Sequence, residues 1–372
     1  MKLSTRELAT FRRRLLAWFR RHKRNLPWRR TRDPYRIWLS EVMLQQTRVA
    51  AVLPYYRRFL RRFPNVRALA RARADEVLKH WAGLGYYSRA RNLHRAAREI
   101  VVRHGGSFPR QLRAALSLPG VGRYTARAVL SIAYGAPYAV LDGNVARVLA
   151  RLDAIRGDLR DPQRWRQVGE MAQQLVAPAA PGNWNQAVME LGATLCTPRA
   201  PRCAACPISR WCRAYRLGTP EAFPGRRRKR APVKVKIAAA VLLDSRGRTL
   251  LIKADSGQDG GLFSRLWQFP AVEVTGDAES ELARHLRASL GLRTRGRGMG
   301  FVALPQARHS VTFYDIALLP FLVRVKGLPA VDGACTPLLN QLRNRPTSNA
   351  TRKIARAALG FVQRTPSAGR VK

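Results

Sequence analysis

The pattern of hydrophobic and polar positions divides the chain into two parts. From residue 4 to about residue 222, apolar residues recur at helical spacing, beginning with Leu8, Phe11 and Leu15. Turn-forming clusters such as Gly-Gly-Ser and Gly-Asn separate the periodic segments. The predicted helices are 5–22, 34–49, 52–63, 68–80, 90–104, 110–117, 124–134, 144–152, 161–175 and 184–195. The first part is therefore expected to be mainly α-helical.

The second part follows a cationic stretch between Pro224 and Pro232, which is typical of an interdomain linker. Beyond it the apolar period changes toward two, as in strands. The predicted strands are 236–243, 249–253, 267–274 and 314–325, and a helix is predicted at 279–290. This order indicates a small α+β domain. The predicted organisation is a helical domain at 1–222, a linker at 223–235, an α+β domain at 236–362 and a tail at 363–372.

The chain is strongly basic. Its 372 residues include 69 Lys and Arg but only 22 Asp and Glu, a formal net charge of +47 that is spread over both parts. Such a charge fits a polyanionic partner, of which nucleic acid is the usual one. Because Arg outnumbers Lys 59 to 10, a GC-rich genome would produce the same composition. Charge alone therefore indicates a class of partner and no reaction.

The composition argues against two other classes of protein. With 46% hydrophobic residues the chain has material for packed cores, unlike a disordered polycation. No apolar run approaches the roughly 18 residues that a membrane-spanning helix needs. Arg6 and Glu7 interrupt the start before a secretory signal can form, and the helical spacing favours an amphipathic first helix over a transit peptide. We expect a cytoplasmic protein with no membrane partner.

Four of the five cysteines lie within 17 residues, at Cys196, Cys203, Cys206 and Cys212. Disulfides are not expected in a chain without a secretion signal. Four thiolates at the spacing C-x6-C-x2-C-x5-C suit either a zinc ion or a four-iron cluster. Zinc ribbons normally have two C-x2-C pairs, and this sequence has one. The spacing therefore favours an iron–sulfur cluster.

Two segments are candidates for phosphate binding. In the sequence LPGVG, from Leu118 to Gly122, Gly120 and Gly122 permit positive φ, so that successive N–H groups can face one anion beside a helix N-terminus. The alternative is a plain turn between helices. In the cysteine loop, ligation at both ends would hold Arg199 and Arg202 outward, where they could meet phosphates.

Two carboxyl groups lie in apolar sequence, which is unusual in so basic a chain. Glu41 lies in WLSEVML, and Asp142 follows AVL. Burial should raise the pKa of Glu41 toward the range of a general acid, whereas a helix N-cap position should keep Asp142 ionised. One neutral and one charged carboxyl suit cleavage of a glycosidic bond through a cationic transition state. The alternatives are a plain helix cap at Asp142 and a salt bridge at Glu41.

Together these segments resemble the helix-hairpin-helix DNA glycosylases of the endonuclease III superfamily, and within them the MutY-type adenine glycosylases. The resemblance covers nearly all of 1–225 and, more loosely, the rest. Its carriers are LPWR at 26–29, WLSEVMLQQT at 38–47, GLGYYSR at 83–89, LPGVG at 118–122, LDGNV at 141–145 and the four cysteines. It implies a mainly α-helical glycosylase part with one [4Fe-4S] cluster, followed by an α+β Nudix-like domain.

The resemblance implies an enzyme of base excision repair that removes adenine mispaired with 8-oxoguanine or guanine in double-stranded DNA. Glu41 would then protonate the adenine and Asp142 would stabilise the sugar cation. Tyr124 and Asn144 would support these two carboxyl groups. The protein is expected to act as a monomer at the bacterial nucleoid.

The resemblance also implies residues that bind DNA and the flipped base. Those implied in DNA binding are Gln46, Tyr86, Tyr87, Arg89, Leu118, Gly120, Gly122, Arg199 and Arg202. Gln46 and Tyr86 would enter the base stack when adenine is flipped out. Those implied in the adenine pocket are Trp28, Arg29, Gln186 and Glu190.

The position of the lyase nucleophile separates two branches of the superfamily. Endonuclease III-type lyases carry a lysine two residues after the second glycine of the hairpin, where it forms a Schiff base with the sugar. Here Tyr124 stands at that position, and no lysine occurs between Lys79 and Lys229. A monofunctional glycosylase is therefore predicted.

The Nudix-like domain departs from its family in two places. Positions 285, 288 and 289 carry no acid, although a Nudix hydrolase needs glutamates there to hold Mg²⁺, so pyrophosphohydrolase activity is not expected. The family's Phe-Ser-His loop becomes HSV at 309–311. Ser310, with Arg308 and His309 nearby, is implied in recognition of 8-oxoguanine, and a plain strand-end hydroxyl is the alternative.

Two other functions stay open at this point. One is a related glycosylase for another mispaired base, such as thymine or uracil opposite guanine. The other is a non-catalytic DNA-binding protein that keeps the scaffold and the cluster. Retention of both Glu41 and Asp142 argues against the second.

Overall fold

The computed structural model describes residues 3–225, 231–253, 266–292, 299–311 and 313–364. The chain forms two compact units. A helical unit comprises Met1–Ala72 and Ser88–Arg228, and a second unit comprises Arg73–Tyr87 and Lys229–Lys372. The segment 73–87 thus groups with the second unit, although it lies inside the predicted helical domain along the chain.

The first part is helical, as predicted. Its helices are α1 (Thr5–His22), α2 (Pro34–Leu44), α3 (Val49–Arg62), α4 (Val66–Arg71), α6 (Tyr87–Arg103), α7 (Leu112–Leu116), α8 (Arg123–Tyr134), α9 (Gly143–Leu152), α10 (Pro162–Leu175), α11 (Pro181–Thr194) and α12 (Arg213–Arg216). Short 3-10 turns lie at Pro27–Arg29, Cys203–Ala205, Ser209–Trp211 and Pro220–Ala222.

Two predicted helices differ from the structure. The helix predicted at 34–49 ends at Leu44, because Gln46 adopts a left-handed conformation with φ of 54°. The helix predicted at 68–80 is two helices, α4 and α5 (Ala74–Trp81), because the intervening Arg73 is extended. The break at Arg73 coincides with the boundary between the two units.

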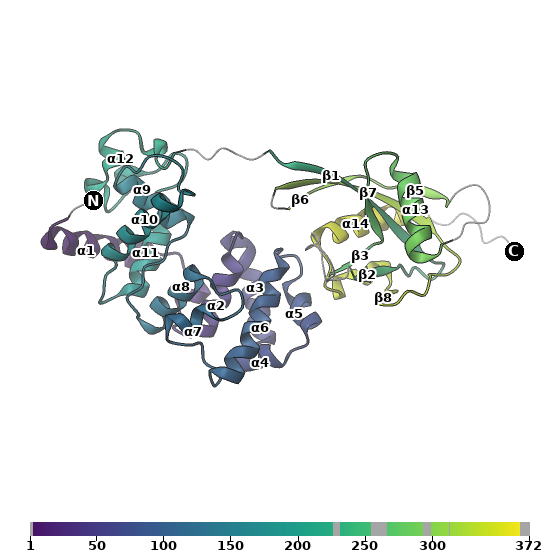
Figure 1. Ribbon diagram of the computed structural model, residues 1–372, viewed down its shortest axis with the longest axis horizontal. Helices are drawn as coiled ribbons and strands as arrows, with labels where there is room; N and C mark the ends of the chain where they lie inside the picture. The colour runs from purple at the N-terminus through teal and green to yellow at the C-terminus, as the bar shows by residue number, and fades with distance from the viewer. Residues whose placement is uncertain (1–2, 226–230, 254–265, 293–298, 312, 365–372) are drawn as a thin grey trace. The chain divides into compact units, whose positions relative to one another are not determined.

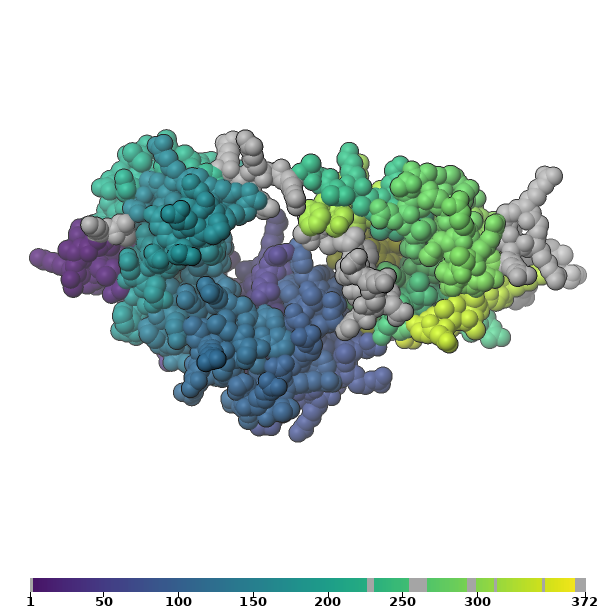
Figure 2. All heavy atoms as spheres, viewed as in Figure 1, coloured from purple at the N-terminus to yellow at the C-terminus, as the bar shows by residue number. Residues whose placement is uncertain are grey.

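The helical unit contains two groups of helices (Figure 1). Helices α1, α9, α10, α11 and α12 surround a core that includes Phe11, Leu15 and Trp184, and the purple residues of α1 form one end of this unit (Figure 2). Helices α2, α3, α7 and α8 form the other group. Within it α2 is buried from Ile37 to Met43 without interruption. A polar residue in this stretch of α2 is therefore placed inside the protein.

The second unit is an α+β structure, as predicted. Its main sheet has the order β4 (Ala271–Glu273), β1 (Val233–Leu243), β7 (Tyr314–Arg324) and β5 (Phe301–Ala303), and β6 (Ala307–Val311) also pairs with β7. Strands β1 and β7 are parallel over their whole lengths, whereas the other pairs are antiparallel. A smaller sheet has the order β3 (Trp267–Gln268), β2 (Leu251–Lys253) and β8 (Ala334–Cys335).

From Ala238 to Leu243 both faces of β1 are buried, because a helix covers each face of the main sheet. Ala238, Ala240 and Leu242 share a core with α13 (Ala278–Leu290). The alternate residues, Ala239 and Val241, share a core with α14 (Asn349–Arg364). Helix α14 was not among the predicted elements, and it closes one face of the sheet.

Candidate active site

A cavity of about 930 Å³ in the helical unit gathers side chains from five segments of the chain. These are the segment around the first 3-10 turn, the C-terminal half of α2 with the turn that follows it, the N-termini of α8 and α9, and α11. Among its lining residues are nine that the sequence predicts: Trp28, Arg29, Glu41, Gln46, Tyr124, Asp142, Asn144, Gln186 and Glu190.

Glu41 is a buried carboxyl group on α2, with 6% of its surface exposed. Burial raises the pKa of Glu41 to about 7, although the Tyr124 hydroxyl lowers it by donating a hydrogen bond to Oε2 at 2.7 Å. The nearby carboxyl group of Asp142 also raises the pKa of Glu41, and Arg29 lowers it. A carboxyl group with this pKa can give a proton near neutral pH.

Asp142 is the N-cap of α9, and its Oδ1 accepts a hydrogen bond from the Val145 N–H at 2.7 Å. Backbone N–H groups of Val145 and Asn144 lower the pKa of Asp142, but burial outweighs them and raises it above its ordinary value. The N-cap hydrogen bonds therefore favour the ionised form of Asp142, as expected, but burial opposes them. Loss of solvent around the carboxyl group is the larger effect.

Tyr124 and Asn144 each contact one of the two carboxyl groups. Tyr124 bonds to Glu41, and its hydroxyl also lies 3.3 Å from the sulfur of Met189. The Asn144 side chain bonds to Asp142, while its Oδ1 accepts from Arg147 Nη2 at 2.9 Å. Helix α11 approaches Asn144 closely, because a Cβ on Gly192 would lie 2.9 Å from the Asn144 Cβ. The two carboxyl groups are thus held from α8, α9 and α11.

Glu190 forms a buried ion cluster at the wall of the cavity. Its Oε2 accepts from Arg29 Nη2 at 2.7 Å and from Arg24 Nη2 at 2.6 Å. Burial alone would raise the pKa of Glu190, but the hydrogen bonds from Arg24 and Arg29 lower it to about 2. Glu190 therefore stays ionised, and it fixes Arg29 at the cavity. Sequence reasoning missed Arg24, whose partner lies 166 residues away.

The two residues that the sequence assigns to the base stack have unusual backbones. Gln46, exposed after α2, has φ of 54°, and Tyr86, also exposed, has φ of 48°. Left-handed residues other than glycine are uncommon and persist where surrounding contacts hold them. Tyr87 differs from Tyr86, since its hydroxyl donates to the Thr347 carbonyl at 2.9 Å within the second unit.

The hairpin between α7 and α8 has one glycine in a left-handed conformation. Gly120 has φ of 73°, and a Cβ there would lie 2.6 Å from the Asn92 Cβ. Gly122 instead has φ of −83° and is the N-cap of α8. Gly122 therefore does not use the positive φ that glycine permits, because an extended N-cap is sufficient to start the helix. The first N–H groups of α8 follow directly and are the expected phosphate donors.

The four cysteines follow α11 and are partly buried. Cys196, Cys206 and Cys212 pack against the core of α1, α9 and α11. Burial raises the pKa of the Cys206 thiol to about 12, whereas the Ile208 N–H lowers it and the other three sulfurs raise it. The sulfurs therefore interact electrostatically. Among the described residues, no group of three or more His, Cys, Asp or Glu side chains could hold a metal ion as arranged.

Arginines position the cysteine loop. Buried Arg151 donates from Nη1 to the Cys196 sulfur at 3.3 Å and to the Thr197 carbonyl at 2.7 Å. Arg199 and Arg202 are exposed, as predicted for phosphate contacts, although Arg202 Nη2 also donates to the Thr194 carbonyl. The four cysteine thiols of the loop could together hold a cofactor that is bound by four thiolates.

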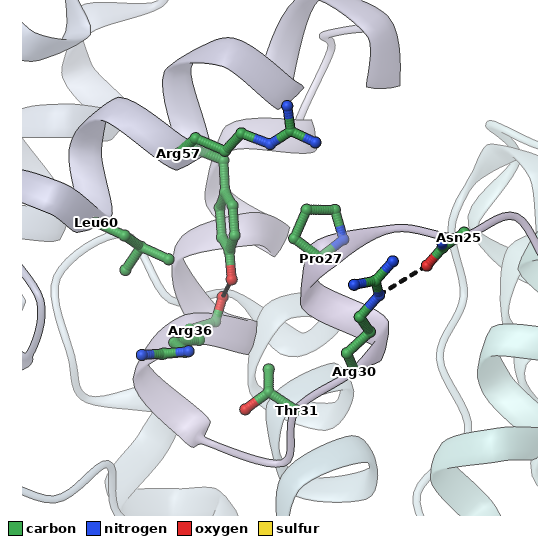
Figure 3. Close-up of a pocket in the computed structure, with 8 residues that line it drawn as sticks. Asn25, Pro27, Arg30, Thr31, Arg36, Arg57 and Leu60 are labelled. Carbon is green, nitrogen blue, oxygen red and sulfur yellow. Dashed lines mark hydrogen bonds between the residues drawn. The ribbon is translucent and has the colours of Figure 1, made fainter.

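A second hollow, of about 400 Å³, lies on the helical unit beside the first 3-10 turn. Figure 3 shows its lining, which includes Pro27, Arg57 and Leu60, with Arg30 bonded to Asn25. Arginine is the only ionisable type among its described lining residues apart from a tyrosine. No carboxyl group is among those described residues, whereas Glu41, Asp142 and Glu190 line the larger cavity.

In the second unit, β6 carries the three residues predicted to recognise 8-oxoguanine. Arg308 and Ser310 are exposed, whereas His309 is half-buried. Successive side chains of a strand point to opposite faces, so His309 faces away from the other two. Burial, and then the nearby Lys353, lower the pKa of His309. One ligand on the exposed face of β6 can therefore meet Arg308 and Ser310.

Among the described residues, no helix has the length and the apolar composition needed to cross a membrane.

Comparison with known proteins connects this site with DNA repair. Residues 39–174 match the HhH-GPD superfamily of base excision DNA repair proteins. The rat protein named adenine DNA glycosylase is 40% identical over 316 residues, which are 72% of this chain and 61% of the rat protein. The human protein of that name is 40% identical over 332 residues, 75% of this chain and 60% of the human protein. The chain thus spans about three fifths of these relatives.

A solved structure shares the helical fold. The structure of a thermostable thymine-DNA glycosylase is 31% identical, with a TM-score of 0.52, and the match covers 56% of this chain and 97% of that chain. The fold of the helical unit is therefore found in a protein named for a different base.

Proposed function

Because the chain belongs to the HhH-GPD superfamily of base excision DNA repair proteins, we propose that it is a monofunctional adenine DNA glycosylase. Its substrate is adenine mispaired with 8-oxoguanine or guanine in double-stranded DNA. The observation that carries the proposal is the meeting of Glu41, Tyr124 and Asp142 in one cavity, since these residues are far apart in sequence and supply an acid, its partner and a carboxylate.

In this mechanism the adenine leaves the base stack and enters the cavity. Glu41, neutral when bound, gives its proton to the base and so turns adenine into a better leaving group. Asp142 stabilises the positive charge that develops on the sugar. After the base has gone, Glu41 is ionised and can take a proton from the water that attacks the sugar.

The absence of a nearby amine supports hydrolysis without strand cleavage. Among the described residues that line the cavity, the cations are Arg24, Arg29 and Arg48, and no lysine is present. A guanidinium stays protonated and does not form a Schiff base. Tyr124, at the position of the lyase lysine, instead bonds to Glu41.

A single-turnover assay tests this function. Enzyme in excess is mixed with duplexes that contain A opposite 8-oxoguanine, A opposite G, or T opposite G, and products are read with and without alkaline heat. We expect adenine loss from the first two duplexes, with strand breaks only after heat. Glu41→Gln should lower the rate at least a hundredfold while duplex affinity stays within about threefold. Excision of thymine but not adenine would favour the function named for the thermostable relative.

We further propose that the four cysteines bind one [4Fe-4S] cluster. Their spacing, their shared environment and the N–H group at Cys206 support it. A four-iron cluster is larger than a single ion, so its thiolates lie farther apart than those of a zinc site. Purified protein should be yellow-brown with four irons per chain, and a colourless protein that contains zinc would contradict the assignment.

For the second unit we propose recognition of 8-oxoguanine by the exposed face of β6. Ser310 can bond to the oxidised base, and Arg308 lies on the same face. Of the family's Phe-Ser-His recognition loop, only the serine is retained in this chain, as Ser310.

A monomer that acts on nucleoid DNA in the cytoplasm is consistent with the proposed function.

A further inference from the structure

Arg89 is a buried arginine near the start of α6, with 8% of its surface exposed. The resemblance places it among residues that bind DNA, but its guanidinium is turned into the protein. Nη1 donates to the carbonyls of Val42, Met43 and Gln45 at 2.9, 2.8 and 2.5 Å. Nη2 donates to the Thr47 hydroxyl at 3.1 Å.

These contacts satisfy the end of the helix that carries Glu41. The last four carbonyls of an α-helix have no partner within the helix, and a cation there also complements the helix dipole. Gln45, the C-cap of α2, is one helical turn after Glu41. Arg89 thus holds α2 at the end nearest its catalytic residue.

The same contacts enclose the turn that presents Gln46. Arg89 binds the residue before it, Gln45, and the residue after it, Thr47, while Gln46 itself is exposed in a left-handed conformation. A second bond, from Gln45 Nε2 to the Thr125 hydroxyl at 3.2 Å, ties this turn to α8. The strained backbone of Gln46 is therefore fixed from both sides.

We propose that Arg89 is a positioning residue, which fixes the turn after α2 so that Gln46 is ready to fill the space left by the flipped base, and that it is no phosphate ligand. This role rests on the proposed function, since it requires that the protein flips a base. It assigns Arg89 to catalysis through Gln46, without contact to the substrate.

The test compares Arg89→Met with Arg95→Met in the full-length protein. Arg95 is exposed on the same helix, so the control removes the same charge without the internal contacts. The duplex contains A opposite 8-oxoguanine, with 2-aminopurine beside the adenine to report unstacking by fluorescence. Arg89→Met should lower the single-turnover rate at least tenfold and reduce the fluorescence rise. Its affinity for DNA should match that of Arg95→Met within threefold.

A direct phosphate contact gives a different result. Arg89→Met would then weaken binding, reduce the salt dependence of affinity by about one ion relative to the wild type, and leave the rate at saturating enzyme like that of Arg95→Met. Equal rates for the two variants overturn the proposal. A wild-type protein that does not excise adenine overturns the proposed function, and this inference with it.

Two further variants keep the test decisive if Arg89→Met does not fold. Arg89→Lys keeps the charge but lacks the planar fork that reaches several carbonyls, so it should slow excision at least threefold, and a wild-type rate overturns the proposal. The double variant Gln46→Ala, Arg89→Lys should excise adenine no more slowly than Gln46→Ala alone, because both substitutions impair the same step. Independent, multiplied losses would show that Arg89 does not act through Gln46.

Discussion

At the scale of single residues, the proposed chemistry depends on a carboxyl group that its surroundings make harder to ionise. Glu41 lies in a stretch of α2 that is buried on every side, from Ile37 to Met43, and burial raises the pKa of Glu41 to about 7. Such a group loses its proton to solvent only above the pH at which most carboxyl groups are ionised. The same burial makes Glu41 costly for folding when it is charged.

The pH dependence of excision should report the pKa of Glu41. Since the neutral form is active, the single-turnover rate should fall as the pH rises through about 7. Tyr124 lowers the pKa of Glu41 through its hydrogen bond, so Tyr124→Phe should move this falling limb to higher pH. The check is a rate profile from pH 5 to 9 for both proteins. A limb that stays in place or moves to lower pH would remove this role of Tyr124.

The sequence revealed site residues where a side chain differed in polarity from the residues around it. Glu41 and Asp142 are acids in apolar runs, and both line the cavity. Arg24 carries no such signal, because it is one of many arginines and its partner Glu190 is distant in sequence. Only the folded chain shows which arginine is paired inside and which is solvated.

At the scale of elements, α9 begins at a residue that also serves the site. Asp142 caps the helix by accepting the Val145 N–H, and it faces the cavity. Asparagine caps helices about as well as aspartate but carries no charge. The structural and the chemical roles of Asp142 can therefore be separated by one substitution.

Asp142→Asn should leave the free energy of unfolding within about 1 kcal/mol of the wild type. Excision should fall at least a hundredfold, because the charge that stabilises the sugar cation is lost. Asp161→Ala is the matched control, since Asp161 caps α10 through Gln163 and Arg164 but does not line the cavity. It should lose about 1 kcal/mol of stability and keep the rate. Denaturant unfolding and single-turnover assays measure both effects.

The elements that sequence reasoning placed correctly have clear apolar periods, and those it missed do not. Helix α14 buries small residues such as Ala350, Ala355 and Ala358, which give a weak apolar stripe. Strand β6 contains Arg308, His309 and Ser310, and it is a strand because it pairs with β7. The carbonyls at the end of α2 are bonded by Arg89 on another helix, which no local pattern records.

At the scale of the whole molecule, the proposed function divides the work between a cavity lined by charged and polar side chains in the helical unit and the exposed face of β6 in the second unit. Ser310→Ala should reduce the preference for A opposite 8-oxoguanine over A opposite G at least threefold, because a hydrogen bond to the oxidised base is lost. The rate on A opposite G should stay unchanged. Ser289→Ala, an exposed serine on α13, is the control and should alter neither rate. An unchanged ratio for Ser310→Ala would remove β6 from recognition of the lesion.

The net charge of +47 acts at this scale too, since it attracts any duplex and names no lesion. In the proposed function, selectivity for the mispair therefore depends on the residues that line the cavity and on the exposed face of β6.

The close approach of Gly192 to Asn144 carries a genetic consequence. One nucleotide change in a glycine codon adds at least a methyl group, and here the methyl carbon would fall 2.9 Å from the Asn144 side chain and 3.0 Å from its carbonyl. The displaced Asn144 would release Asp142. For the proposed glycosylase this removes a support of a catalytic carboxyl group, so descendants that inherit such a change are expected to accumulate mutations.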